Sequence, residues 1–302
     1  MNLRDLEYAV AVADHGHFGR AAAACNVSQP TLSGQILKLE AELGLKLFER
    51  EGRAVRIDAR ATGVIAEARA ALAAAANVTV AAQAARDPFA GPLRIGMIAT
   101  VAPYLLPFAL PAAIKALPQT PLHLIEDLTD RLLQRMSEGA LDAAVIATDP
   151  QSARLDSIEL YEEPFYLVTS PRPRARRRHS IRVDEIDPGT LLLLAEGHCL
   201  RDQALALCGA AERAAGADVR ATSLETVRHL AAAGQGATLA PLLAFADWRR
   251  QSHGLDGLRV VGVGASRLVR LIHRRNAPRR AAIEALAASL RTSAEAALAA
   301  SA

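Results

Sequence analysis

Cys199 and Cys208 are the residues whose type and spacing point most directly to chemistry. Cys199 follows an apolar run and a glycine, so we expect it at the start of a helix. The positive end of a helix and nearby cations both lower a thiol pKa, and His198 and Arg201 flank this cysteine. A thiolate in this setting could attack a peroxide and become a sulfenic acid, which a second thiol could convert to a disulfide.

The spacing of the two cysteines makes a disulfide conditional on a structural change. If residues 199–208 form one continuous helix, a rise of about 1.5 Å per residue places their Cα atoms about 13 Å apart. A disulfide tolerates no more than about 7 Å, so closing the bond would require local unfolding. The alternative is two inert, buried thiols, because free cysteine is among the most buried residue types. The chemistry of the residues alone favours that alternative, and Cys25, among alanines, is expected to be a packing residue.

A second set of residues points to DNA. Residues 18–25 predict a short helix and residues 26–29 a turn. A second helix is predicted over residues 30–40, with Ser28 as its N-cap and Pro30 in its first turn. Its buried face would consist of Leu32, Ile36 and Leu39, and its outward face of Thr31, Ser33, Gln35 and Lys38. Hydrogen-bonding side chains near the start of a second helix are what base reading in the major groove requires.

The segment that follows distinguishes this reading from a generic helical hairpin. Residues 43–57 predict a helix end and then a tight basic turn between two short extended pieces. Such a hairpin is a wing, and Arg50, Arg53 and Arg56 could reach phosphates or the minor groove from it.

Several elements must position these residues. An alanine-rich stretch from Ala59 to Arg86 predicts one long helix, which Pro88, Gly91 and Pro92 would end. Short β-rich runs then alternate with helical stretches, which indicates an α/β architecture with mainly parallel sheets. The strands are expected at 93–98, 122–125, 143–146, 165–169, 191–194 and 268–272, with a helix near 130–139.

The pattern along the chain resembles the LysR-type transcriptional regulators. The resemblance runs almost continuously over residues 3–57, from Ala21-Ala22 through Gln29-Pro30 to Leu47-Phe48-Glu49-Arg50, and returns at 141–145 and 233–241. It implies a winged helix-turn-helix, a linker helix and a sensing domain of two Rossmann-like subdomains, as in periplasmic binding proteins. It also implies promoter DNA and RNA polymerase as partners and a homodimer or homotetramer joined through the linker helix.

The resemblance also gives domain boundaries and DNA contacts. The DNA-binding domain would span residues 1–57, the linker 58–88 and the sensing domain 91–302. Subdomain I would comprise about 91–163 and 269–302, and subdomain II about 164–268. The DNA-binding residues would be Ser28, Gln29, Pro30, Thr31, Ser33, Gln35, Lys38, Arg50 and Arg53.

Three segments are similar to the peroxide-sensing members of this family: Gly197 to Ala204 with Cys208, Thr100 to Pro107, and Ser28 to Ile36 at the DNA-binding end. The similarity implies that hydrogen peroxide is the signal, with Cys199 as the peroxidatic thiol and Cys208 as the resolving one. Thr100, Thr129 and His198 would line the peroxide pocket. Arg267 would complete it, with Arg270 as the alternative. Such a regulator would control oxidative-stress genes as an activator, a repressor or both.

Composition sets outer limits on the function. The chain has 302 residues, a formal net charge of +3 and 51% hydrophobic residues, enough for a substantial core. We expect no secretory signal and no membrane span, since prolines or Asn77 and Gln83 interrupt the apolar stretches. The histidines have no metal-binding spacing. We therefore expect a cytoplasmic protein with no metal or cofactor.

Three other functions remain as alternatives. The sensing domain could bind a small organic effector, with inert cysteines. A thiol peroxidase would use the same two cysteines, but the predicted DNA-binding end argues against an enzyme. A solute-binding protein would share the two-lobed α/β pattern, but the expected lack of a signal peptide argues against that function.

Overall fold

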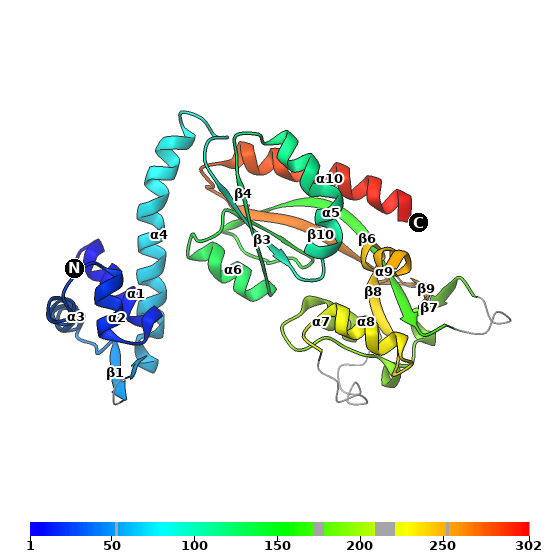
Figure 1. The fold of residues 1–302 in the computed structure, drawn as a ribbon, viewed down its shortest axis with the longest axis horizontal. Helices are drawn as coiled ribbons and strands as arrows, with labels where there is room; N and C mark the ends of the chain where they lie inside the picture. The colour runs from blue at the N-terminus through cyan, green and yellow to red at the C-terminus, as the bar shows by residue number, and fades with distance from the viewer. Residues whose placement is uncertain (52–53, 172–177, 209–220, 252–253, 302) are drawn as a thin grey trace. The chain divides into compact units, whose positions relative to one another are not determined.

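The computed structural model describes residues 1–51, 54–171, 178–208, 221–251 and 254–301 (Figure 1). The chain divides into two compact units. The first comprises Met1–Arg86 with Ser137–Ala140, and the second comprises Asp87–Met136 with Leu141–Ala302. We describe each unit by itself.

Three helices and a β-hairpin form the N-terminal unit. The elements are α1 (Leu3–His15), α2 (Phe18–Ala24), α3 (Gln29–Leu43), β1 (Phe48–Glu51) and β2 (Ala54–Ile57). Ser28 is the N-cap of α3, as predicted, because its side chain accepts a hydrogen bond from the Thr31 backbone N–H. The helix runs three residues further than predicted and ends at Gly44, which has a φ of 65°.

The apolar face of α3 forms the core of this unit. Leu32, Ile36 and Leu39 are all buried, as their spacing predicted. The strands β1 and β2 pair antiparallel, with Phe48 opposite Ile57, which confirms the predicted wing hairpin. Arg53 lies outside the described residues.

The alanine-rich stretch forms a 3-10 turn, η1 (Ala59–Ala61), and then the long helix α4 (Thr62–Ala84). Among the described residues, the helix from Ala59 to Ala84 is long and apolar enough by length and composition to cross a membrane. By this criterion Asn77 and Gln83 do not break the apolar stretch as we expected, because the alanines around them keep it apolar. Length and composition alone are weak support for a membrane span.

The second unit is built on an eight-stranded sheet. Its strands follow the order β4-β3-β5-β10-β6-β9-β7, and β8 pairs with β6. Their bounds are β3 (Leu93–Ile98), β4 (Leu122–Asp127), β5 (Ala143–Ile146), β6 (Leu155–Thr169), β7 (Ser180–Arg182), β8 (Thr238–Pro241), β9 (Asp256–Val261) and β10 (Ser266–Arg274).

Two long strands, β6 and β10, connect the halves of this sheet. They pair antiparallel with each other, and from Phe165 onward β6 pairs instead with β8 and β9. The sheet is therefore mixed, and the expectation of mainly parallel pairing was wrong, because the two connecting strands run against their neighbours. The predicted strand at 191–194 is also absent: Leu191 and Leu194 form only isolated bridges.

Helices cover both faces of the sheet. They are α5 (Ala102–Ala116), α6 (Thr129–Ser137), α7 (Cys199–Leu207), α8 (Leu224–Ala232), α9 (Leu242–Gln251) and α10 (Arg280–Ser301), with the 3-10 turns η3 (Val183–Glu185) and η4 (Pro188–Thr190). Figure 1 shows α5 and α10 together over one face near β3, with α6 on the other. One continuous apolar core fills the layers between them, and the buried Cys199 belongs to it.

Candidate functional site

The helix α7 places the two cysteines at its opposite ends. Cys199 is its first residue and is buried, with 7% of its surface exposed. Cys208 is the C-cap, so the condition of one continuous helix between them is met. Gly197, before the helix, has a φ of 90°, a conformation that favours glycine, and a Cβ there would lie 3.0 Å from the Leu128 side chain. The glycine lets the chain enter α7 against Leu128.

A very small cavity lies beside Cys199. Its lining comes from three segments: the end of β3, the start of α6 and the start of α7. The residues are Ile98, Ala99, Thr100, Asp127, Leu128, Thr129, Gly197, His198 and Cys199. Its volume is about 10 Å³, close to the minimum of about 10–15 Å³ that one water molecule needs. The cavity therefore has room for about one water-sized molecule in this structure.

Burial dominates the protonation of Cys199. It raises the pKa of the thiol, while the charge of Arg267 and the Thr129 hydroxyl act in the opposite direction. The Thr129 oxygen is buried and has no hydrogen-bond partner among the described residues, so a thiolate at Cys199 is the acceptor that would satisfy it. The thiol is thus protonated at neutral pH in this structure.

The expectation of a depressed thiol pKa was therefore wrong. Burial lowers the pKa of His198, so the imidazole beside the cysteine is neutral and contributes no positive charge. Arg201 donates instead to the Leu194 carbonyl at 3.1 Å. The sequence placed both cations next to Cys199, but neither supplies the expected charge.

Arg267 supplies the positive charge near the site. Its Nη1 donates to the Thr100 hydroxyl and its Nη2 to the Thr100 carbonyl, both at 2.9 Å. The guanidinium also forms an ion pair with Glu163 at 2.9 Å, and both side chains are 1% exposed. Neither arginine lines the cavity itself, and Arg270, the alternative, pairs with Glu159 at 3.3 Å. The structure thus brings Arg267 to Thr100.

Sequence reasoning missed Glu163. It lies opposite Arg267 in the register of β6 and β10, 104 residues away along the chain. Its second carboxylate oxygen accepts from the Leu243 backbone N–H at 2.8 Å, in the first turn of α9. No local pattern marks this residue, because its partners are defined only by the pairing of two distant strands.

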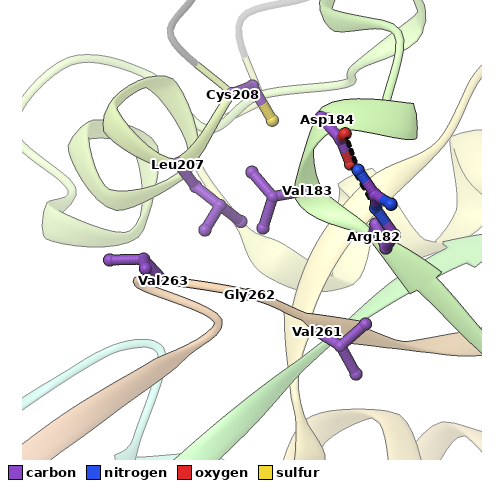
Figure 2. A pocket seen from close by; sticks show the side chains of 8 residues that line it. All are labelled: Arg182, Val183, Asp184, Leu207, Cys208, Val261, Gly262 and Val263. Atoms are coloured by element: carbon purple, nitrogen blue, oxygen red, sulfur yellow. Dashed lines mark hydrogen bonds and ion pairs between the residues drawn. The ribbon is translucent and has the colours of Figure 1, made fainter.

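Cys208 faces a different environment from Cys199. Figure 2 shows its sulfur pointing toward an open hollow of about 660 Å³, lined by the end of α7, the start of η3 and the turn after β9. The side chains beside it include Leu207 and Val183, and an Arg182–Asp184 ion pair lies at the edge. Cys208 is half-buried, and burial raises the pKa of its thiol as well. With α7 intact, about 13 Å of helix separates the two Cα atoms.

Both parts of the chain match models of one protein family. The model described as bacterial regulatory helix-turn-helix protein, lysR family, matches residues 3–62, and the LysR substrate binding domain matches residues 86–295. The chain belongs to the LysR family.

Individual relatives of this LysR-family protein carry names that refer to peroxide. It is 40% identical to the hydrogen peroxide-inducible genes activator of Dickeya chrysanthemi, over 96% of this chain and 95% of the relative. It is 39% identical, with the same coverage, to the DNA-binding transcriptional dual regulator OxyR of Escherichia coli K12. Among solved structures, it is similar to full-length OxyR from Pseudomonas aeruginosa with a cysteine-to-aspartate substitution. The TM-score is 0.75 at 37% identity, covering 96% of this chain and 95% of the other.

The helix-turn-helix of this LysR-family protein presents the predicted polar residues along α3. Thr31 and Lys38 are exposed, and Ser33 and Gln35 are half-buried. The Ser28 and Thr31 hydroxyls lie 2.7 Å apart and hydrogen-bond to each other. Gln29 and Pro30, in the first turn, are exposed, and Arg50 lies in β1. Cys25 is half-buried against the core of this unit, as a packing residue would be.

Proposed function

We propose that this LysR-family protein is a transcription regulator that senses hydrogen peroxide through Cys199 and Cys208 and controls oxidative-stress genes. The observation that carries the proposal is the cavity of about 10 Å³ that Cys199 lines. Pockets for organic ligands usually measure about 300–1,000 Å³, so this cavity is far too small for an organic molecule and leaves only a very small signal such as peroxide. The alternative of an organic effector acting at Cys199 is disfavoured for the same reason.

The chemistry uses the two thiols in sequence. The Cys199 sulfur attacks one peroxide oxygen and the O–O bond breaks. The other oxygen leaves as hydroxide, takes up the thiol proton and becomes water, which leaves a sulfenic acid on Cys199. The Cys208 sulfur then displaces hydroxide from that sulfenic acid, and this hydroxide takes the Cys208 proton to form a second water. Two thiols thus supply the two electrons that reduce one peroxide to two waters.

The pocket residues have distinct parts in this proposal. Thr100 and Thr129 present hydroxyls to the bound peroxide, and His198, as a neutral imidazole, adds a further polar group. Arg267 supplies the positive charge that favours the thiolate. The names of the relatives support the same signal: one similar structure is an OxyR cysteine-to-serine mutant from Corynebacterium glutamicum with hydrogen peroxide bound, at a TM-score of 0.66 and 33% identity over 99% of this chain and 94% of the other.

The proposed output is promoter DNA binding by a symmetric oligomer in the cytoplasm. Residues 1–57 would bind DNA, residues 58–88 would join two copies, and residues 91–302 would sense the signal. Thr31, Ser33 and Gln35 would contact base edges, while Lys38, Arg50 and Arg53 would contact phosphates or the minor groove. The assembly would be a dimer or tetramer that acts together with RNA polymerase. The thiols would act as a switch for transcription and not as an enzyme.

Footprinting on promoter DNA tests the proposal directly. The purified full-length protein, Cys199→Ser and the matched control Cys25→Ser would each be footprinted with and without peroxide. We expect peroxide to change the footprints of the wild type and Cys25→Ser but not that of Cys199→Ser. Peptide mapping should show a Cys199–Cys208 disulfide in the two responsive proteins.

Two results would contradict the proposal. A peroxide-dependent footprint in Cys199→Ser would place the sensor elsewhere. Sustained peroxide turnover with a thiol reductant, without any change in the footprint, would indicate a thiol peroxidase.

A further inference from the structure

We propose that Glu163 is a positioning residue of the peroxide site: it holds Arg267, which in turn fixes the Thr100 hydroxyl so that its proton points into the cavity. The inference rests on the proposed function, since it concerns how the same site receives peroxide. It assigns a role to a residue that lies outside the cavity lining and that touches neither cysteine.

Glu163 determines the orientation of the guanidinium. Arg267 Nε and Nη2 both donate to Glu163 Oε2, at 3.0 and 2.9 Å. Because two N–H groups on one edge of the planar guanidinium donate to the same carboxylate oxygen, the guanidinium cannot turn without breaking one of these two hydrogen bonds. Glu163 is itself held, because Oε1 accepts from Leu243 N at 2.8 Å in the first turn of α9. The carboxylate therefore ties Arg267 to a rigid part of the fold.

Arg267 in turn determines the direction of the Thr100 hydroxyl. A hydroxyl has one proton to donate and two lone pairs with which to accept. Arg267 Nη1 donates to Thr100 Oγ1 at 2.9 Å, so one lone pair is occupied and the hydroxyl proton must point elsewhere. Thr100 lines the cavity, and the described residues give its hydroxyl proton no acceptor. The proton is then available to the peroxide oxygen that leaves as hydroxide.

Glu163 also sets the net charge behind the cavity. The ion pair is 1% exposed on both sides, so almost no solvent screens it. While paired, Glu163 offsets part of the positive charge that the guanidinium of Arg267 exerts on Cys199. If the carboxylate is neutralised, the positive charge is uncompensated, and the pKa of the Cys199 thiol should fall. The other charged group that acts on this thiol is Asp202, in α7, which raises its pKa.

Two reaction rates of Cys199 distinguish a positioning role of Glu163 from a general loss of structure in its variants. In a full-length protein with Cys25→Ser and Cys208→Ser, Cys199 is the single remaining thiol. The rate of alkylation by iodoacetamide across a range of pH measures the pKa of this thiol. The second-order rate constant for its oxidation by hydrogen peroxide depends in addition on the orientation of the Thr100 hydroxyl in the cavity. Glu163→Gln should lower the pKa and so increase alkylation at neutral pH. Its ratio of peroxide rate to alkylation rate should fall by about a hundred- to a thousandfold, the scale of losing one fixed donor.

Two further variants complete the design. Glu162→Gln is the matched control: it makes the same change one residue earlier, at an exposed side chain that accepts a hydrogen bond from Ser266. It should keep the wild-type ratio and pKa. Glu163→Asp keeps the charge but shortens the side chain by one methylene, so it should keep the pKa and show an intermediate loss of the ratio.

The outcomes are distinguishable. A wild-type ratio in every folded Glu163 variant overturns the positioning role, and if Glu163→Gln does not fold, Glu163→Asp decides. The proposed function fails separately, if wild-type Cys199 reacts with peroxide no faster than Cys208 does in a Cys199→Ser protein.

Discussion

Unwinding of α7 is the step on which the proposed switch depends, and Ala206→Gly tests it. Ala206 is exposed and lies in the last turn of α7, so the substitution removes only a methyl group that faces solvent. Disulfide formation must reduce a Cα separation of about 13 Å to about 7 Å or less, which a helix from Cys199 to Leu207 cannot do while intact. Any change that weakens this helix should therefore favour the oxidised state.

The size of the effect follows from helix propensity. Glycine in place of alanine destabilises a helix by about 0.5–1 kcal/mol. If α7 is helical in the reduced state and unwound in the oxidised one, that amount appears in the equilibrium between them. For a two-electron couple about 30 mV corresponds to about 1.4 kcal/mol, so the reduction potential should become more negative by about 10–20 mV.

The assay is a redox titration of the full-length protein in dithiothreitol buffers, followed by thiol trapping and mass spectrometry. Ala296→Gly is the matched control, since Ala296 is an exposed alanine in α10, which has no part in the disulfide. It should leave the potential unchanged. A potential for Ala206→Gly that equals those of the wild type and Ala296→Gly would show that α7 stays helical on oxidation, and the reasoning would be refuted.

Three other predictions concern separate parts of the chain. Because burial raises the pKa of Cys199, alkylation of this thiol should keep increasing from about pH 6 to about pH 9, and a plateau near neutrality would contradict the raised pKa. Tyr104→Phe removes a 2.8 Å hydrogen bond to Glu225, whose carboxylate also accepts from Trp248. It should lower the free energy of unfolding, measured in urea, by about 1–3 kcal/mol. Tyr166→Phe is the control, because the Tyr166 ring stacks on Phe245 and the substitution keeps the ring. Gln35→Ala should weaken binding to the specific operator by about 1–3 kcal/mol at one base position, whereas equal loss on random DNA in titrations would exclude base reading.

The parts of the structure that follow local rules could be predicted from the sequence. The Ser28 cap and the buried face of α3 depend on residues within one helix, so side-chain type and spacing were enough. The strands β3 and β5 were predicted with their observed bounds, because each is a short run that is apolar and buried, apart from the half-buried Arg94 in β3. The placement of Cys199 at the start of α7 followed from the glycine and the apolar run that precede it.

Features that depend on distant contacts could not be predicted. The antiparallel pairing of β6 with β10 brings Glu163 opposite Arg267. The sequence around either residue contains no pattern that predicts this contact. The direction of the Cys199 pKa shift was predicted wrongly for the same reason. Neighbours in the sequence, His198 and Arg201, suggested a cationic setting, whereas the packing of three segments around the thiol makes burial the largest effect.

In the proposed sensor, burial of the Cys199 thiol would give the site its selectivity. The small cavity would keep larger oxidants and electrophiles away from the sulfur, and burial raises the thiol pKa, so the unoccupied site should react slowly. A peroxide molecule bound there would meet the hydroxyls of Thr100 and Thr129, which both line the cavity, at the point where charge develops. Reactivity then depends on occupancy by the right molecule more than on a permanently ionised thiolate. The helix that encloses Cys199 must also unwind before Cys208 can reach it, so one element both restricts access to the thiol and carries the structural change that follows oxidation.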